Sequence, residues 1–357
     1  MKPIYKPLFF ILISIATTAC LKEDQLKKTF TRYAPKGLND GHIIASPEDV
    51  NINPDELEKV YRGVHEDDEL WQIRSLLVFR NGNLVAESYM KDDSDITKPG
   101  AIWSCTKQIL GVLTGMALEE DIIENINDPI AMYIPDLTNK YPDKADISIV
   151  SLLTMQSGIG YINEGIEGQT DDLLRELPDR IMDFVLARPI IEPQGEVFHY
   201  NDGDPHIIAG LLQEALNKPM DEWADEVLFS KLGINNLEWR RYKDGTTQGG
   251  YGILTTPRDL AKITLCVADG GKWRGEQLVS EDWISTMTSV IIDTLDFEYD
   301  FGYYWWIDSV RNIHFMWGHG GQFAFVCPDK NVVIVMTSEP NTQSDHEISA
   351  DHRHWRL

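Results

Sequence analysis

The stretch IWSCTKQILGVLTGMAL runs from Ile102 to Leu118. Nearly all of its residues are apolar or small, which is typical of a helix buried on every side. Ser104 and Lys107 stand three positions apart near its start, so they share one helical face. A lysine at the root of a buried helix needs a chemical reason, because burial disfavours its charged form.

Ser104 and Lys107 are of the residue types that serve as a nucleophile and its base. A serine hydroxyl is a poor nucleophile until a neighbouring group takes its proton, and a desolvated, neutral lysine can take it. A serine at a helix start also brings a developing oxyanion close to free backbone N–H groups. The four-residue pattern alone is common by chance, and the alternative is a helix-start serine followed by a surface lysine. The apolar residues around Lys107 disfavour that alternative.

Strand patterns flank this helix and return near the end of the chain. Asn53-Pro54 predicts a helix start, and two β-rich runs around Asn81-Gly82 predict a hairpin. The expected strands are Ile73–Phe79, Leu84–Tyr89, Tyr303–Ile307, Ile313–Trp317, Gln322–Val326 and Val332–Thr337. Residues 120–245 instead show short helical patterns, at Leu173–Leu177, Ile181–Ala187, Ile207–Leu216 and Trp223–Leu228. Strands at both ends around a helical middle predict an α+β fold, in which an antiparallel sheet is flanked by helices and a helical subdomain of about residues 120–245 is inserted.

The composition excludes several classes of function. Lys and Arg number 32 and Asp and Glu number 57, which gives a formal net charge of −25. This balance argues against a nucleic-acid partner, because phosphate binding needs a basic face. The nine His show no pair at metal-ligand spacing beside an acid, so we expect no metal site.

The first residues have the pattern of a lipoprotein signal peptide. Two Lys precede an apolar run that is too short to span a bilayer and that ends at Thr17-Thr18-Ala19-Cys20. We therefore expect residues 1–19 to be removed, Cys20 to be acylated, residues 20–50 to form a tether and residues 51–357 to form the domain. The segment Lys22-Glu23-Asp24 resembles an export signal of surface lipoproteins, and a solvated tether is the alternative interpretation. The expected location is the outer membrane of a Gram-negative bacterium, facing the periplasm or the surface, with the membrane contacted through the lipid anchor only.

Three segments together resemble the β-lactamase-related serine hydrolases, in the class C and penicillin-binding-protein-like branch. Ser104-x-x-Lys107 resembles the nucleophile motif of that family. The segment QGEVFHYND, at residues 194–202, resembles its Pro-Gly-Thr-x-Phe-x-Tyr-Ser-Asn segment. The segment WGHGGQ, at residues 317–322, resembles its Lys-Thr-Gly strand.

The resemblance implies a β-lactamase/transpeptidase-like fold and a role for each matched residue. Ser104 would attack, Lys107 and Tyr200 would share proton transfer, and Tyr200 would protonate the leaving group. The backbone N–H groups of Ser104 and Gln322 would form the oxyanion hole. Gly320, Gly321 and His319 would belong to the same substrate-binding turn, and Asp202 would also belong to the substrate-binding residues. The reaction of this family requires no cofactor or metal.

Two departures from the family pattern bear on the substrate. Asp202 is an acid where β-lactamases use a neutral amide, and His319 stands where they usually carry Lys. Both changes weaken recognition of an anionic β-lactam. The variant around Asp202 resembles the branch that contains family VIII esterases and 6-aminohexanoate-dimer hydrolase. A small-molecule or peptide-like ester or amide is therefore the expected substrate, and the alternatives are a D-Ala-D-Ala carboxypeptidase-type peptidase, a true β-lactamase or a non-catalytic binding lipoprotein.

Overall fold

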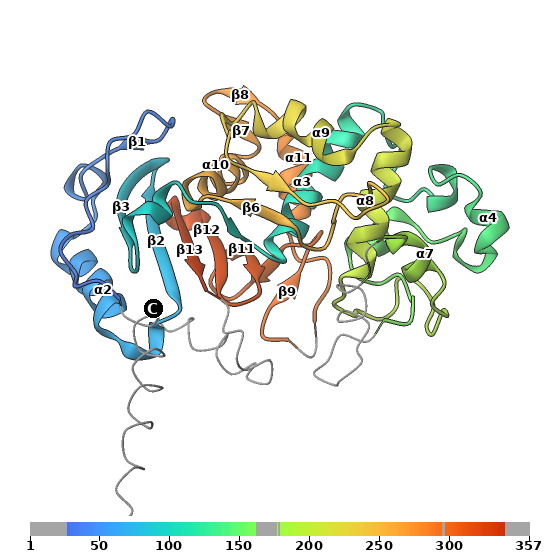
Figure 1. Cartoon of the computed structure of the whole chain (residues 1–357), viewed down its shortest axis with the longest axis horizontal. Coiled ribbons are helices and arrows are strands. Elements are labelled where there is room, and N and C mark those ends of the chain that lie inside the picture. The colour runs from blue at the N-terminus through green and yellow to red at the C-terminus, as the bar shows by residue number, and fades with distance from the viewer. Residues whose placement is uncertain (1–26, 162–176, 178, 295–296, 340–357) are drawn as a thin grey trace, which may run out of the picture.

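An eight-stranded sheet runs through the structure, a computed structural model that describes residues 27–161, 177, 179–294 and 297–339 (Figure 1). Its strand order is β1-β3-β2-β13-β12-β11-β10-β9. The strands are β1 (Ile43–Ile44), β2 (Ile73–Arg80), β3 (Asn83–Tyr89), β9 (Asp300–Phe301), β10 (Trp306–Asp308), β11 (Ile313–Gly318), β12 (Gln322–Cys327) and β13 (Val332–Ser338). All neighbours pair antiparallel except β1 and β3, which are parallel.

The centre of the sheet joins the two ends of the described chain. β2 pairs with β13 from Arg80 opposite Val332 to Ile73 opposite Ser338. β2 and β3 form the expected hairpin, in which Asn81 and Gly82 have positive φ angles of 50° and 75°. The prediction of a sheet closed by distant segments is confirmed.

The two faces of the sheet are covered by different helices. The helices are α2 (Pro54–Glu66), α3 (Cys105–Glu119), α4 (Leu137–Lys140), α5 (Ile149–Leu153), α7 (Ile181–Leu186), α8 (Gly203–Leu216), α9 (Met220–Ala224), α10 (Pro257–Ala268) and α11 (Glu281–Met287), with a π-helical turn η6 (Asp225–Phe229) after α9. Residues of β2 alternate between the faces: Leu76 packs with α2, whereas Leu77 faces the larger core that contains α3 and α10. This layering buries almost the whole of α3, as its sequence predicts.

The helical half agrees with the predicted subdomain in most segments. α7, α8, α9 and η6 lie close to the predicted ranges, while Leu173–Leu177 lies outside the described residues except for Leu177. A three-stranded sheet was not predicted; its strands are β4 (Gly100–Ala101), β6 (Ile253–Thr255) and β5 (Glu238–Trp239), and a two-residue hairpin of β7 (Lys272–Trp273) and β8 (Glu276–Gln277) lies elsewhere.

The predicted strand Tyr303–Ile307 is wrong in its first half. Tyr304 has a φ angle of 62°, in the left-handed region, so the chain turns there and the strand begins at Trp306. The carbonyl of Tyr304 accepts a hydrogen bond of 2.6 Å from the side chain of Gln108 on α3, and this bond holds the turn against the buried helix.

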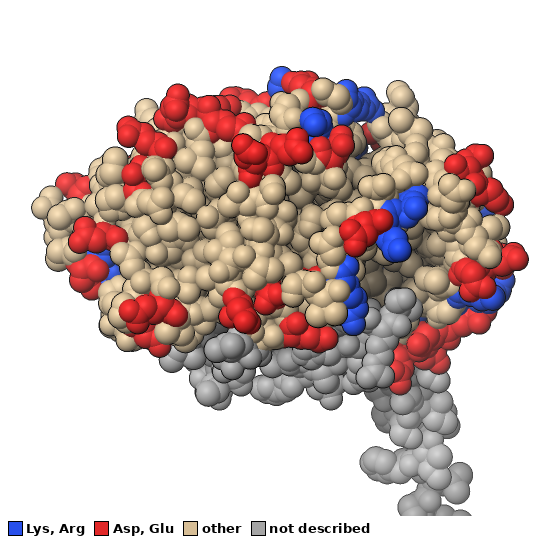
Figure 2. Space-filling model, turned by 180° about the vertical axis from the view of Figure 1, so that it is seen from behind, with Lys and Arg blue, Asp and Glu red and all other residues tan. Residues whose placement is uncertain are grey.

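The surface agrees with the acidic composition. In Figure 2, Asp and Glu side chains are spread over the visible face, whereas Lys and Arg gather in a few small patches. No helix among the described residues is long and apolar enough to cross a membrane.

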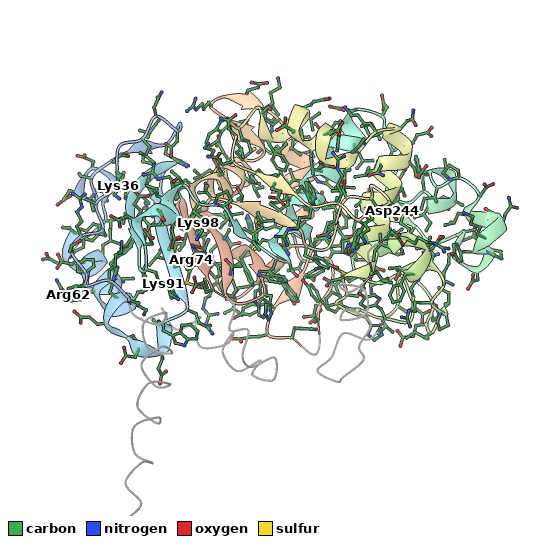
Figure 3. All side chains as sticks on the ribbon, viewed as in Figure 1. Lys36, Arg62, Arg74, Lys91, Lys98 and Asp244 are labelled. Atoms are coloured by element: carbon green, nitrogen blue, oxygen red, sulfur yellow. The ribbon has the colours of Figure 1, made fainter. Side chains whose placement is uncertain are left out.

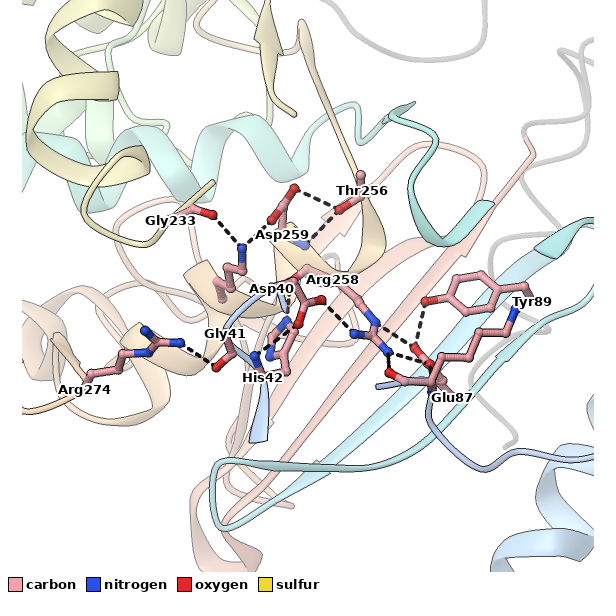
Figure 4. A network of polar contacts seen from close by, with 12 residues as sticks. Asp40, Gly41, His42, Glu87, Tyr89, Gly233, Thr256, Arg258, Asp259 and Arg274 are labelled. Carbon is pink, nitrogen blue, oxygen red and sulfur yellow. Dashed lines mark hydrogen bonds and ion pairs between the residues drawn. The ribbon is translucent and has the colours of Figure 1, made fainter. Parts of the chain in front are cut away.

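Residues 27–50, the described part of the expected tether, lie along the edge of the sheet. The Tyr33 carbonyl accepts a bond of 2.8 Å from the backbone of Glu87 on β3, and Lys36 lies beside the same strand (Figure 3). The buried guanidinium of Arg258, on α10, donates to the carboxylates of Glu87 and Asp40 (Figure 4). These contacts attach the segment to the domain, which composition alone does not indicate.

Candidate active site

Ser104 lies at the N-terminal end of α3, half-buried, and a strained residue holds it there. Trp103 has a φ angle of 50°, which an L-residue adopts at a cost in free energy. Ser104 occupies the N-cap position, yet its side chain forms no capping hydrogen bond. Its Oγ instead lies 2.9 Å from Nζ of Lys107. The hydroxyl is therefore directed towards the lysine rather than to the helix backbone.

Lys107 is completely buried, with 0% of its surface exposed. Besides Ser104, its Nζ donates to the carbonyl of Gly250, at 2.8 Å, and to the carboxylate of Asp202. The three partners come from α3, from the start of α8 and from the loop before β6. Segments far apart in the sequence thus meet at this one amine.

Tyr200 reaches the same point from the segment that leads into α8. Its hydroxyl shares hydrogen bonds with Ser104 and Lys107, and Nζ of Lys107 lies 5.1 Å from the centre of its ring. Burial raises the pKa of Tyr200 above its ordinary value, and the positive charge of Lys107 acts in the opposite direction. The phenol is therefore a proton donor at neutral pH. Rings of Phe301 and Trp306 pack against it.

Asp202 precedes α8 with helical backbone angles and makes no capping bond with its side chain. Asn201, one residue earlier, caps the helix by accepting from the Asp204 N–H at 2.7 Å. The backbone there is held by His206, whose Nδ1 lies 2.5 Å from the Asp202 carbonyl. Burial lowers the pKa of His206 to about 4, so the ring is neutral at pH 7. Because a carbonyl only accepts, Nδ1 carries the proton, and Nε2 accepts from the hydroxyl of Tyr242 at 3.0 Å. The carboxylate of Asp202 is left to face Lys107.

The turn between β11 and β12 lies against the start of α3. Gly320 and Gly321 have positive φ angles of 75° and 88°, which a side chain would strain. A Cβ on Gly318 would stand 2.2 Å from the Ile102 carbonyl, so this position requires glycine for the close approach. His319 is exposed, and its ring meets that of Trp103 edge-on at 5.4 Å.

Gln322 is fixed at the end of this turn by bonds on both sides. Its side-chain amide donates to the Ser338 carbonyl at 2.7 Å and accepts from the Ser338 backbone N–H at 3.2 Å. Its own carbonyl accepts from the thiol of Cys105, next to the nucleophile. The backbone of Gln322 is thereby held beside the N-terminal end of α3.

A cavity of about 130 Å³ has Trp103 and Gln322 in its lining. Arg74 and Lys98, both labelled in Figure 3, line it together with the ends of β4 and β13. Arg74 is paired with Asp95 there. Among the described residues, no group of three or more His, Cys, Asp or Glu is placed to hold a metal ion.

The structure brings most of the predicted site residues together. Ser104, Lys107, Tyr200 and Asp202 meet around Nζ of the lysine, and residues 319–322 lie next to the start of α3. Cys20 lies outside the described residues. Sequence reasoning missed the Gly250 carbonyl and His206. The doublet Gly249-Gly250 was the available signal, since a Cβ on Gly250 would stand 3.0 Å from the Asp202 carbonyl.

Comparisons with known proteins agree with this geometry. A family model described as Beta-lactamase matches residues 75–355. The 6-aminohexanoate-dimer hydrolase of Paenarthrobacter ureafaciens is 24% identical over 236 residues, which are 60% of this chain and 56% of that protein. The chain therefore matches little more than half the length of this curated relative.

Solved structures show the same fold. A Bacillus anthracis protein, provisionally described as a 6-aminohexanoate-dimer hydrolase, superposes with a TM-score of 0.70 at 20% identity, over 92% of this chain and 88% of its own. The hydrolase EstCE1, described as having promiscuous acyltransferase activity, superposes with a TM-score of 0.65 at 16% identity, over 80% of this chain and 93% of its own. The family match spans most of the chain, and the chain belongs to the β-lactamase family of serine hydrolases.

Proposed function

We propose that the protein cleaves an ester or amide bond through an acyl-enzyme on Ser104. One observation carries this proposal. The hydroxyl of a half-buried serine lies 2.9 Å from the amine of a fully buried lysine, and a tyrosine hydroxyl is bonded to both. A nucleophile within hydrogen-bond reach of its base, with that base oriented by further groups, is the arrangement that activates a serine.

The proposed reaction follows from these positions. Ser104 attacks the carbonyl carbon while its proton passes to the group around Lys107, and the backbone N–H groups of Ser104 and Gln322 stabilise the oxyanion. Tyr200 protonates the departing alcohol or amine, because its raised pKa keeps it a phenol. Water then attacks the acyl-enzyme by the same route in reverse and releases the acid.

Within this chemistry we favour an esterase or amidase over a β-lactamase. The buried carboxylate of Asp202 offsets the positive charge of Lys107, so less positive charge remains near the nucleophile to attract an anionic β-lactam. His319, where β-lactamases usually carry Lys, offers a weaker cation to the antibiotic carboxylate. The relatives named for hydrolysis of an amide oligomer and for acyl transfer support the same preference. A D-Ala-D-Ala carboxypeptidase-type peptidase and a non-catalytic envelope protein remain the rival functions.

The test compares hydrolysis of p-nitrophenyl butyrate and nitrocefin by the purified protein, with Ser104→Ala as the blank. We expect turnover of the ester, little turnover of nitrocefin, and loss of at least about 10³-fold in Ser104→Ala, since the nucleophile is removed. A fluorophosphonate should label the wild type and not the variant. Fast nitrocefin turnover would identify a β-lactamase, and labelling that persists in Ser104→Ala would exclude Ser104 as the nucleophile.

We also propose that the protein is an outer-membrane lipoprotein acylated at Cys20, with a peptide-like or small-molecule substrate in the periplasm or at the cell surface. The supporting observation is the sequence pattern of residues 1–24. The full chain expressed in a Gram-negative host should fractionate with the outer membrane, and Cys20→Ser should be released from it. Retention of Cys20→Ser in the membrane fraction would contradict the lipid anchor.

A further inference from the structure

The carboxylate of Asp202 contacts the amine of Lys107. Only 2% of its surface is exposed, and none of Lys107 is. Two isolated ions at this depth would be costly, whereas an ion pair compensates the charge of both. An ammonium beside a carboxylate is therefore the favoured resting state of the pair.

This resting state creates a problem for the reaction. An ammonium has no lone pair. Besides the hydroxyl of Tyr200, oxygens of Ser104, Asp202 and Gly250 lie around Nζ. Such a lysine cannot accept the proton of Ser104. Tyr200 cannot accept it either, because its raised pKa keeps it protonated. A proton acceptor has to be found elsewhere in the site.

The start of α8 shows how Asp202 comes to face Lys107. The helix is capped by Asn201, whose side-chain oxygen accepts from the Asp204 N–H at 2.7 Å. Asp202, the next residue, has helical backbone angles and makes no capping bond with its side chain. Ser104 precedes α3 in the same helical conformation, also without a capping bond. Both side chains are turned to Lys107.

We infer that the Lys107–Asp202 pair acts as one base, in which Asp202 stores the proton that Lys107 passes on. This inference rests on the proposed function and deepens it. As the Ser104 oxygen forms its bond to the carbonyl carbon, Nζ of Lys107 gives one proton to the Asp202 carboxylate and takes the proton of Ser104. When the leaving group departs with the Tyr200 proton, Lys107 reprotonates Tyr200, and Asp202 returns its proton to Lys107. Asp202 thus acts through Lys107 and touches no substrate.

The other titratable groups around the pair have distinct pH behaviour. His206 has a pKa lowered to about 4 by burial, and Cys105 and Tyr200 have pKa values raised by burial. The hydroxyls of Tyr242 and Tyr251 bond each other behind His206. Asp204, two residues after Asp202, has a pKa raised by burial to about 7 and therefore titrates within the pH range of the experiment described below. A control for Asp204 is consequently required.

The experiment measures the rate of fluorophosphonate labelling of Ser104 against pH in the full-length protein. In the inferred reaction, labelling of the wild type requires an ionised Asp202. The acid limb of the wild-type plot of labelling rate against pH therefore follows the titration of that carboxyl. In Asp202→Asn the lysine must lose its proton to solvent instead. We expect the acid limb to move up by about one pH unit or more, with labelling at pH 7 about tenfold slower and recovery at high pH. Asp202→Glu should keep the wild-type limb.

Two matched variants separate this role from a structural one. Asp259→Asn removes the carboxylate partner of another buried lysine, Lys262, and Asp204→Asn removes the neighbouring buried acid. Both should keep the wild-type acid limb.

Each outcome decides the inference. Coincident limbs in wild type and Asp202→Asn would overturn it, as would a folded Asp202→Asn that is silent at every pH. If Asp202→Asn does not fold, Asp202→Ser is read by the same criteria. Absence of labelling in the wild type would instead refute the proposed function.

Discussion

Lys107 and Lys262 are two buried lysines with closely similar partners. Each donates to one aspartate and to one backbone carbonyl: Lys107 to Asp202 and Gly250, Lys262 to Asp259 and Gly233. Only 2% of Lys262 is exposed, against none of Lys107. Asp259 and Gly233 can be followed in Figure 4. Burial beside an acid is therefore not what distinguishes a candidate catalytic lysine in this molecule.

The two lysine–aspartate pairs differ in the further residue that each pair contacts. Lys107 also donates to the hydroxyl of half-buried Ser104. The side chain of Ser104 makes no capping bond to α3. Asp259, in contrast, is tied to Thr256, which caps α10 in the ordinary way and bonds the same carboxylate at 3.0 Å. One pair is directed towards a nucleophile that solvent can reach, and the other closes a helix start. Lys107 therefore differs from Lys262 in its contact with a hydroxyl that solvent can reach.

The largest expected effect comes from replacing each lysine with methionine. Either change leaves a buried aspartate without its cation, so we expect both to lower the free energy of unfolding by about 3–5 kcal/mol. Lys107→Met should in addition reduce ester hydrolysis by roughly 10²–10⁴-fold, because proton transfer is lost. Lys262→Met should keep the wild-type rate per folded molecule. Denaturant unfolding and active-site labelling of the folded fraction measure the two effects separately.

Either of two results would contradict the different roles given to Lys107 and Lys262. An active Lys107→Met would show that this amine carries no proton in the reaction. A Lys262→Met protein that is folded but inactive would show that the second pair also supports the chemistry, so that similar partners do mean similar roles.

Much of the fold follows from the sequence, for physical reasons. The apolar residues of α3 predict a buried helix, Asn81-Gly82 predicts the hairpin, and three motifs in order predict the family, which the comparisons confirm. The turn at Tyr304 was missed, because aromatic residues are typical of strands and a left-handed backbone leaves no mark in composition. The docking of residues 27–50 depends on Arg258, more than 200 positions away.

The candidate site divides in the same way. Ser104 and Lys107 are close in sequence, so helical spacing alone places them together. That Asp202 meets Lys107, 95 positions earlier, depends on how α8 packs against α3, and spacing does not predict it. The Gly250 carbonyl is a backbone atom, which any residue type supplies. The catalytic roles themselves stay predictions until the variants above are measured.

Asp204 is a third buried acid, and its carboxylate is bonded to a hydroxyl rather than to a lysine. Its Oδ1 accepts from the Ser157 hydroxyl at 2.7 Å, and its Oδ2 is buried with no hydrogen-bond partner. Burial raises its pKa from the ordinary 3.8 to about 7. Asp202 and Asp259 each have an ammonium to compensate their charge, and Asp204 has a hydroxyl instead. Asp204 should therefore gain its proton at a higher pH than an ordinary carboxyl does as the pH falls.

The smallest expected effect is the pH dependence of stability that this carboxyl causes. Because the folded pKa is raised, the folded protein holds a proton that the unfolded chain has released between about pH 4 and pH 7. Stability from this group is thus present at low pH and is lost as the pH rises through about 7. Burial also lowers the pKa of His206 and of His314 to about 4, which gives the opposite slope below pH 6.5.

Asp204→Asn isolates the acid from those histidines, because they are common to both proteins. We expect the free energy of unfolding of the wild type, minus that of Asp204→Asn, to fall by about 2 kcal/mol between pH 5 and pH 8. Urea unfolding at matched ionic strength measures it. A difference that stays constant with pH would mean that Asp204 ionises like an exposed carboxyl. In that case an ammonium is not what separates Asp202 from its neighbour, and the pairing argument for Lys107 loses its contrast.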